Sequence, residues 1–110
     1  MNPVVDLTTF TELQSNTGTD FVIELVDTWV AEAPGMQAEL RAAWMAGAAD
    51  RFRRAAHSLK TNAQTFGALR LAEAARMLEL QGLPADAAPL DTLDARCHEA
   101  LAALQALARG

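Results

Sequence analysis

The chain has 110 residues, enough for one domain with its own hydrophobic core, and we expect residues 1–110 to form a single domain. Alanine and leucine supply most of the 51% hydrophobic content, tyrosine is absent and aromatic residues reach only 5%, which predicts an all-α fold. A formal net charge of −5 argues against nucleic-acid binding, because that function relies on a basic surface facing phosphates.

The single cysteine, Cys97, excludes an internal disulfide and a cysteine-based zinc site, and it suits a reducing compartment. The first residues lack the basic and apolar regions of a signal peptide. No apolar run approaches the roughly 18 residues needed to span a membrane. We therefore expect a cytoplasmic protein that acts without a membrane.

The first two predicted elements are a short helix and a long one. A capping box from Thr9 to Glu12 predicts a short helix that ends before Ser15 and covers one end of a bundle. A long helix follows from about Thr19, a possible N-cap, because apolar residues recur at the spacing of one buried face. They are Phe21, Leu25, Trp29, Ala33, Met36, Leu40 and Ala43 or Trp44. Pro34-Gly35 interrupts the stripe without changing its phase, which favours one kinked helix.

Three further helices are predicted, over residues 49–66, about 69–80, and from 86 or 89 to about 108. Gly67 is placed to end the first of them, and Pro89 fits only the first turn of the last. Their inward residues are Phe52, Ala55, Ala56, Leu59, Ala63 and Phe66, then Leu71, Ala75 and Leu78, then Leu90, Leu93, Cys97, Leu101 and Leu104. Short connections between four main helices predict an antiparallel four-helix bundle with a short additional N-terminal helix.

One histidine lies off the apolar face of the helix at 49–66. His57 is about 140° around the helix axis from Phe52, well outside the apolar cluster. The polar residues on the same outward strip are Arg53, Lys60, Thr61 and Gln64. Residues 51–72 contain no Asp or Glu, and Lys60 is the only lysine of the chain. The sequence thus predicts a locally positive surface on an acidic protein.

A solvent-facing histidine with these neighbours suits a carrier of phosphoryl groups. Neutral imidazole, whose ordinary pKa is about 6.5, keeps a nucleophilic nitrogen near neutral pH. Lys60, one turn further on, can offset charge on phosphoryl oxygens. Gln64 can hydrogen-bond either the phosphoryl group or the other imidazole nitrogen. Arg53 and Arg54 are placed to meet an acidic partner.

The run from His57 to Ala68, HSLKTNAQTFGA, resembles the signature of histidine-containing phosphotransfer (HPt) domains of two-component phosphorelays. Upstream, APGMQAELRAA at residues 33–43 resembles the proline-containing helix of that family. The segment DRFRRAAH, at residues 50–57, resembles its lead-in to the phosphorylated histidine. The clear pattern covers residues 31–82.

The resemblance implies that His57 is phosphorylated, that Lys60 assists it and that Gly67 helps to close the helix turn. Family members accept a phosphoryl group from a receiver-domain aspartate and return it to another, and the receiver holds the magnesium. The resemblance therefore implies a phosphorelay intermediate without a cofactor or catalytic activity of its own. Its expected partners are response-regulator receiver domains and a hybrid histidine kinase. We expect a monomer, because the outward strip is polar.

Two departures from the family pattern concern partner binding. Thr61 stands where the family usually has glycine, and Asn62 stands where a serine is common. The branched Thr61 side chain either crowds the approach of a receiver or adds a hydroxyl contact. We assign Arg53, Arg54, Thr61 and Gly67 to the partner-binding surface.

Two other functions fit the sequence less well. The Thr61 departure leaves open a non-phosphorylated helical adaptor that docks on and inhibits a receiver or a histidine kinase. A metal-dependent enzyme using His57 and His98 has little support. Two histidines far apart in sequence and one thiol fall short of the three or four ligands typical of metal sites, and we expect no metal. The chain also lacks a phosphate-binding loop and hydrolase motifs.

Overall fold

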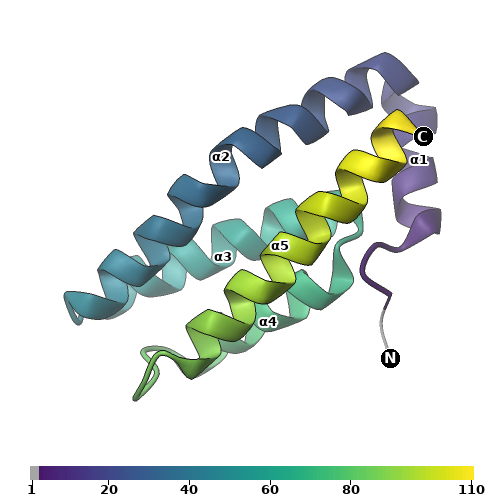
Figure 1. The fold of residues 1–110 in the computed structure, drawn as a ribbon. Helices are drawn as coiled ribbons and strands as arrows, with labels where there is room; N and C mark the ends of the chain where they lie inside the picture. Colours follow the sequence, from purple (N-terminus) through teal and green to yellow (C-terminus); the bar gives the residue numbers. More distant parts are fainter. Residues whose placement is uncertain (1–2) are drawn as a thin grey trace.

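The computed structural model describes residues 3–110, and this part of the chain folds into five α-helices without a strand. The helices are α1 (Leu7–Thr17), α2 (Thr19–Met45), α3 (Ala49–Phe66), α4 (Leu69–Gln81) and α5 (Ala88–Arg109). Helices α2 to α5 form a closed ring, in which α2 and α4 each pack against both α3 and α5 (Figure 1). The predicted antiparallel four-helix bundle with an additional N-terminal helix is confirmed.

Aliphatic and aromatic side chains from all four main helices fill the core. The largest fully buried side chains are Trp29, Phe52, Leu40, Leu59, Leu71, Leu93, Leu104, Val22, Val26 and Cys97. Trp29 of α2 stacks on Phe66 of α3, with ring centroids 5.1 Å apart and ring planes only 4° from parallel. No polar or charged residue is buried within residues 3–110, so the polar chemistry of the described chain lies at its surface.

Helix α2 is continuous through Pro34, as predicted, although proline removes one hydrogen bond from the helix interior. The predicted buried stripe is wrong at its start, because the side chain of Phe21 is 48% exposed. Val22 and Val26 are buried instead, and the stripe continues through Trp29. Phe21 and Val22 both fit a three-and-four spacing, and only the rotation of α2 against its neighbours selects between them.

The predicted capping box of the first helix is also wrong. Asp6 caps α1, and its carboxylate accepts hydrogen bonds from the backbone N–H of Thr9, at 3.3 Å, and from the Thr9 hydroxyl, at 2.5 Å. The helix therefore begins at Leu7, before the threonine that sequence placed at its start, and it continues to Thr17. Gly18, with φ of +93°, ends α1 and precedes α2 directly.

Thr19 is the first residue of α2 rather than its cap, because Gly18 holds the cap position without a side-chain hydrogen bond. Helix α1 packs against α2 and α3, and it lies across the end of the bundle that also holds the C-terminus (Figure 1). The expected cover over one end of the bundle is therefore present.

Gly67 ends α3 in the left-handed conformation, with φ of +77°, as its position predicts. Its carbonyl accepts a hydrogen bond of 2.7 Å from the backbone N–H of Asp6. A Cβ at this position would stand 2.9 Å from the carbonyl oxygen of Asp6, so the N-terminal segment also requires glycine here. Only residues 67 and 68 separate α3 from α4, and the two helices form a tight antiparallel hairpin.

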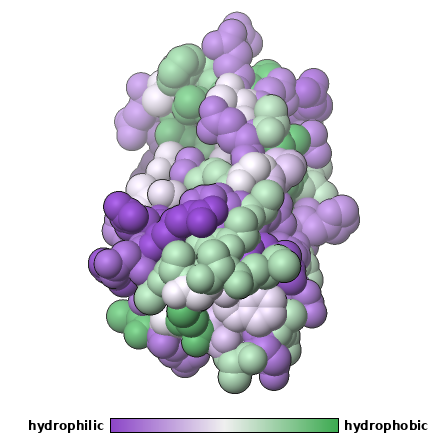
Figure 2. Space-filling view, turned by 90° about the vertical axis from the view of Figure 1, so that its left-hand side faces the viewer, coloured by the Kyte–Doolittle hydropathy of each residue, from purple (hydrophilic) through white to green (hydrophobic). Residues whose placement is uncertain are grey.

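Helix α4 ends at Gln81 and α5 begins at Ala88 with Pro89 in its first turn, close to the predicted limits. Seen from the end that carries the α2–α3 turn and the α4–α5 loop, the surface mixes hydrophilic and apolar side chains (Figure 2). Within the described chain, every helix is too short or too polar to cross a membrane.

Candidate functional site

His57 lies near the middle of α3, and its side chain is 58% exposed, as its position off the apolar face predicts. Its Nδ1 atom lies 2.6 Å from Oε2 of Glu79 on α4. An ionised carboxylate can only accept a hydrogen bond, so Nδ1 carries the proton and donates it to Glu79. In the neutral ring, the Nε2 atom, which forms no hydrogen bond within residues 3–110, is then the nitrogen that carries the lone pair.

The same carboxylate also holds Lys60. Lys60 Nζ lies 2.5 Å from Oε1 of Glu79, and these side chains are only 20% and 17% exposed. The hydrogen bond from Lys60 holds the pKa of Glu79 below its usual range, His57 lowers it further, and desolvation by burial opposes both effects. Glu79 therefore stays ionised and connects the exposed imidazole to the only lysine of the chain.

Glu79 is the residue that sequence reasoning missed, although the chain held a signal for it. In a tight helical hairpin, residues at equal distances from the turn lie at the same level. The α3–α4 connection is at residues 67–68, which places His57 opposite residue 78. Glu79 follows Leu78, an inward residue of α4, and lies at the edge of the α3–α4 interface. The acidic residue that pairs with the basic side chains of residues 51–72 near His57 thus lies on the next helix, α4.

Two arginines on α3 share a hollow with the histidine. Arg53, Arg54, Ser58 and Glu79 surround His57 in a surface hollow of about 440 Å³. Arg53 Nη2 lies 3.6 Å from the carboxylate of Asp50. Arg54 forms no ion pair with any residue from 3 to 110. The hollow therefore places two guanidinium groups beside the imidazole of His57.

The positive surface is smaller than the sequence predicted. Arg51 donates two hydrogen bonds to Glu39 of α2, at 2.7 and 2.8 Å, and Arg70 lies 3.7 Å from Glu99 of α5. These acidic residues lie on other helices, so a count along residues 51–72 misses them. Arg53 and Lys60 are paired as well, with Asp50 and Glu79, so Arg54 in the hollow beside His57 is the basic residue of this stretch that forms no ion pair among residues 3–110.

A family model described as the Hpt domain matches residues 24–107. The chain belongs to the Hpt domain family. The resemblance seen around His57 is thus confirmed, and the match extends past residue 82 into α5. Histidine phosphotransfer in two-component phosphorelays is the function of this family. No curated protein and no solved structure matches the chain.

Two other predicted site residues lie on the outward strip of this Hpt domain without touching the imidazole nitrogens. Thr61 Oγ1 donates a hydrogen bond of 3.0 Å to the carbonyl oxygen of His57, so its hydroxyl is bound to the backbone. Gln64 is exposed and makes no hydrogen bond to His57. The contact to the second imidazole nitrogen, one of the two that the sequence allows for Gln64, is made by Glu79 because that nitrogen faces α4.

Gly67 does not belong to an exposed partner-binding surface. It is buried and bonded to Asp6 under the N-terminal segment of the Hpt domain. Its role in closing the helix is structural, as the left-handed backbone shows.

The remaining thiol and imidazole of the Hpt domain lie apart from this site. Cys97 is fully buried in α5, and burial, together with the charge of Asp94, raises the pKa of its thiol to about 11. Its neighbour His98 is exposed. Across residues 3–110, His, Cys, Asp and Glu nowhere gather in a group of three or more that could hold a metal ion.

Proposed function

We propose that Nε2 of His57 accepts a phosphoryl group from the aspartyl phosphate of one receiver domain and passes it to an aspartate of another. The observation that carries this proposal is the contact between His57 Nδ1 and Glu79, because it fixes the tautomer in which Nε2 is the nucleophile. The protein acts as a carrier and has no catalytic activity of its own.

The proposed transfer is a direct displacement at phosphorus. The Nε2 lone pair forms the new P–N bond while the P–O bond to the receiver aspartate breaks, and the bonding electrons leave with the aspartate carboxylate. Nδ1 keeps its proton, so the phosphorylated ring carries a positive charge that the Glu79 carboxylate offsets. The return step is the reverse reaction on the carboxylate of a second receiver.

We assign the supporting roles to residues around the imidazole. Lys60 stands one turn from His57 and offsets charge on the phosphoryl oxygens, and Gln64 on the same strip is a hydrogen-bond donor for them. The hollow that holds Arg53 and Arg54 suits the acidic phosphorylation site of a receiver. In this proposal the magnesium ion belongs to the receiver, and the donor receiver is part of a hybrid histidine kinase.

The geometry favours a carrier over a non-phosphorylated adaptor. An adaptor would need only the shape and charge of the surface. It would gain nothing from a carboxylate bonded to the second nitrogen of an exposed histidine. The Glu79 contact orders the ring with Nδ1 toward α4, which suits a site where Nε2 must react.

Phosphotransfer from labelled receivers tests the proposal. We expect wild-type protein to take label, His57→Gln to take none, and Glu79→Gln to transfer at least about 10-fold more slowly, because an amide no longer fixes the tautomer or the charge. The matched control is Glu73→Gln on the same helix, since Glu73 is bonded to Arg76 and lies outside the hollow. It should transfer at the wild-type rate.

Nitrogen NMR of the phosphorylated protein should place the phosphoryl group on Nε2. Label retained by His57→Gln, or a wild-type protein that takes no label from any receiver encoded by the same genome, would contradict the proposal. An adaptor would bind receivers equally well after His57→Ala and would carry no label.

A further inference from the structure

A second hollow adjoins the one that holds His57. It is a groove of about 560 Å³ between α2 and α3, lined by Ala31, Glu32, Gly35, Met36, Glu39, Ala55 and Ser58. Ser58 lines both hollows, so the groove opens directly beside the phosphotransfer site. A protein that reaches Nε2 of His57 therefore also covers this groove.

Gly35 in this groove has no close neighbour and no backbone angle that requires glycine. It lies within α2 with helical backbone, and a Cβ added there would meet no atom within 4 Å. Glycine weakens a helix relative to alanine, so an unneeded glycine in a helix interior is unfavourable. Gly67, in contrast, has both a left-handed backbone and a close neighbour. The missing side chain of Gly35 is useful only to something that approaches from outside.

The lining of the groove also suits an approaching apolar side chain. Ala31 lies one turn before Gly35, and Ala55 lines the groove from α3, so both helices contribute a small apolar side chain. Met36, partly buried in the groove, is flexible and adapts to different contact shapes.

The groove and the adjoining hollow carry charges of both signs, which would match a partner surface that also carries both. Glu32 lines the groove and forms no ion pair within the described chain, whereas Glu39 is bound by Arg51. Arg54 lies in the adjoining hollow, also without an ion pair among residues 3–110. A partner with acidic groups opposite Arg54 and a basic residue opposite Glu32 would match this arrangement.

We propose that the groove receives an apolar side chain of the receiver domain that stands next to its phosphorylated aspartate, with a basic receiver residue at Glu32. This inference rests on the proposed function of His57 and specifies where its partner docks. Gly35 is then a position that sets the closeness of approach and so selects among receivers.

The variant Gly35→Leu tests the groove, because Gly35 lines it, a Cβ there meets no atom within 4 Å, and leucine favours helix. We expect its thermal stability to be at least that of the wild type, and its transfer from a labelled receiver to fall at least about 10-fold through weaker binding. Phosphorylation of His57 by phosphoramidate, a small donor, should be unchanged. Ala102→Leu, which adds a side chain of the same size at an exposed position of α5, should transfer normally.

Glu32→Arg is a second test that changes only surface charge, and we expect weaker receiver binding that depends on salt concentration. The groove assignment would be overturned if both Gly35→Leu and Glu32→Arg transferred at the wild-type rate. If transfer were still lost in His57→Gln, the proposed function would stand. Label that persists in His57→Gln would instead overturn the proposed function and the docking assignment with it.

Discussion

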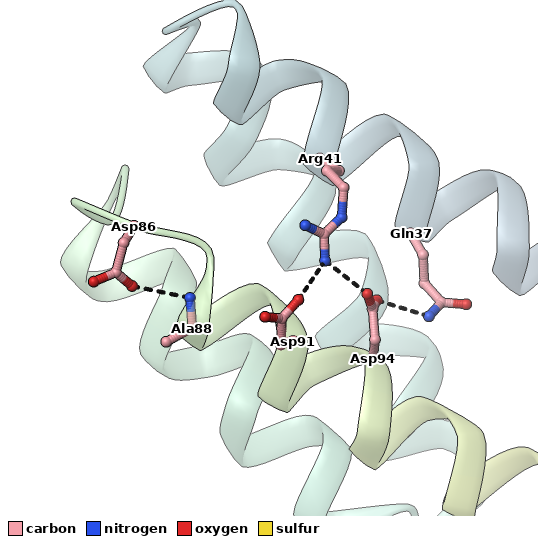
Figure 3. A network of polar contacts seen from close by, with 6 residues as sticks. All are labelled: Gln37, Arg41, Asp86, Ala88, Asp91 and Asp94. Atoms are coloured by element: carbon pink, nitrogen blue, oxygen red, sulfur yellow. Dashed lines mark hydrogen bonds and ion pairs between the residues drawn. The ribbon is translucent and has the colours of Figure 1, made fainter.

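Within the four-helix bundle, helix α2 packs against α5 on one side and α3 on the other, and the two interfaces are closed in different ways. Toward α5, Arg41 bonds to Asp91 at 3.1 Å and to Asp94 at 2.8 Å, and Gln37 bonds to Asp94 at 2.9 Å (Figure 3). Beside them Asp86 accepts the backbone N–H of Ala88 at the start of α5 (Figure 3). Trp44 Nε1 extends the same side with a bond of 2.9 Å to the carbonyl of Pro84.

Toward α3 the surface of α2 is open near the histidine. The groove there includes Gly35 and small side chains from both helices, and one arginine–glutamate pair, Arg51 with Glu39, crosses between the helices. The same helix is thus bonded across one interface and hollow beside the other. Polar pairs therefore close the side of α2 that faces α5, and the open side is the one next to His57.

The largest effect is expected at Gly67, the glycine that internal contacts require. Gly67→Ala should lower the free energy of unfolding by about 2 kcal/mol, because alanine is strained at positive φ and its Cβ approaches Asp6. Urea unfolding measures this change. Gly67→Asn, which tolerates the left-handed conformation better, should lose less. An unchanged unfolding midpoint for Gly67→Ala would contradict the structural role.

Gly35, the glycine of the open side, should respond in the opposite direction. Gly35→Ala is expected to raise the free energy of unfolding by up to about 1 kcal/mol, because the position is helical and the added methyl meets nothing. The same urea titration measures it. A destabilised Gly35→Ala would show that this glycine does serve the fold, and it would remove the contrast with Gly67.

Loss of the polar contacts between α2 and α5 should lower stability only slightly. Arg41→Ala is expected to lower the free energy of unfolding by about 0.5 kcal/mol, because its ion pairs with Asp91 and Asp94 are partly exposed to water. Phosphotransfer should be unaffected, since Arg41 faces α5. A loss of transfer in this variant, at unchanged stability, would mean that the two sides of α2 are not separate.

The smallest expected effect is the pH dependence contributed by Glu79. Its pKa is lower in the folded protein than its ordinary value of 4.5. The resulting contribution to stability is therefore complete above the unfolded pKa and is lost as pH falls through the folded one. Stability measured from pH 6 to pH 3 should fall less steeply in Glu79→Gln than in the wild type. Superimposable pH profiles would contradict the ion pair with Lys60.

Much of the fold could be predicted because helix signals are local. Apolar spacing set the four main helices, and Gly67 and Pro89 marked helix ends correctly. The start of α1 was missed because the box at Thr9 looked like a cap, while Asp6 uses Thr9 as its hydrogen-bond donor. Phe21 was misplaced because its exposure depends on how α2 is rotated against two neighbouring helices.

For the candidate site, the sequence by itself determined that His57 faces solvent among polar and basic neighbours, since helical spacing is enough to place one face of α3 outward. Only the tertiary structure brought Glu79 to Nδ1, because that contact joins residues 22 positions apart on two helices. The groove at Gly35 was likewise decided by the packing of α2 on α3. Distances between residues on different helices depend on how each helix is rotated and shifted along its axis in the bundle. The spacing of residues along one helix does not determine them.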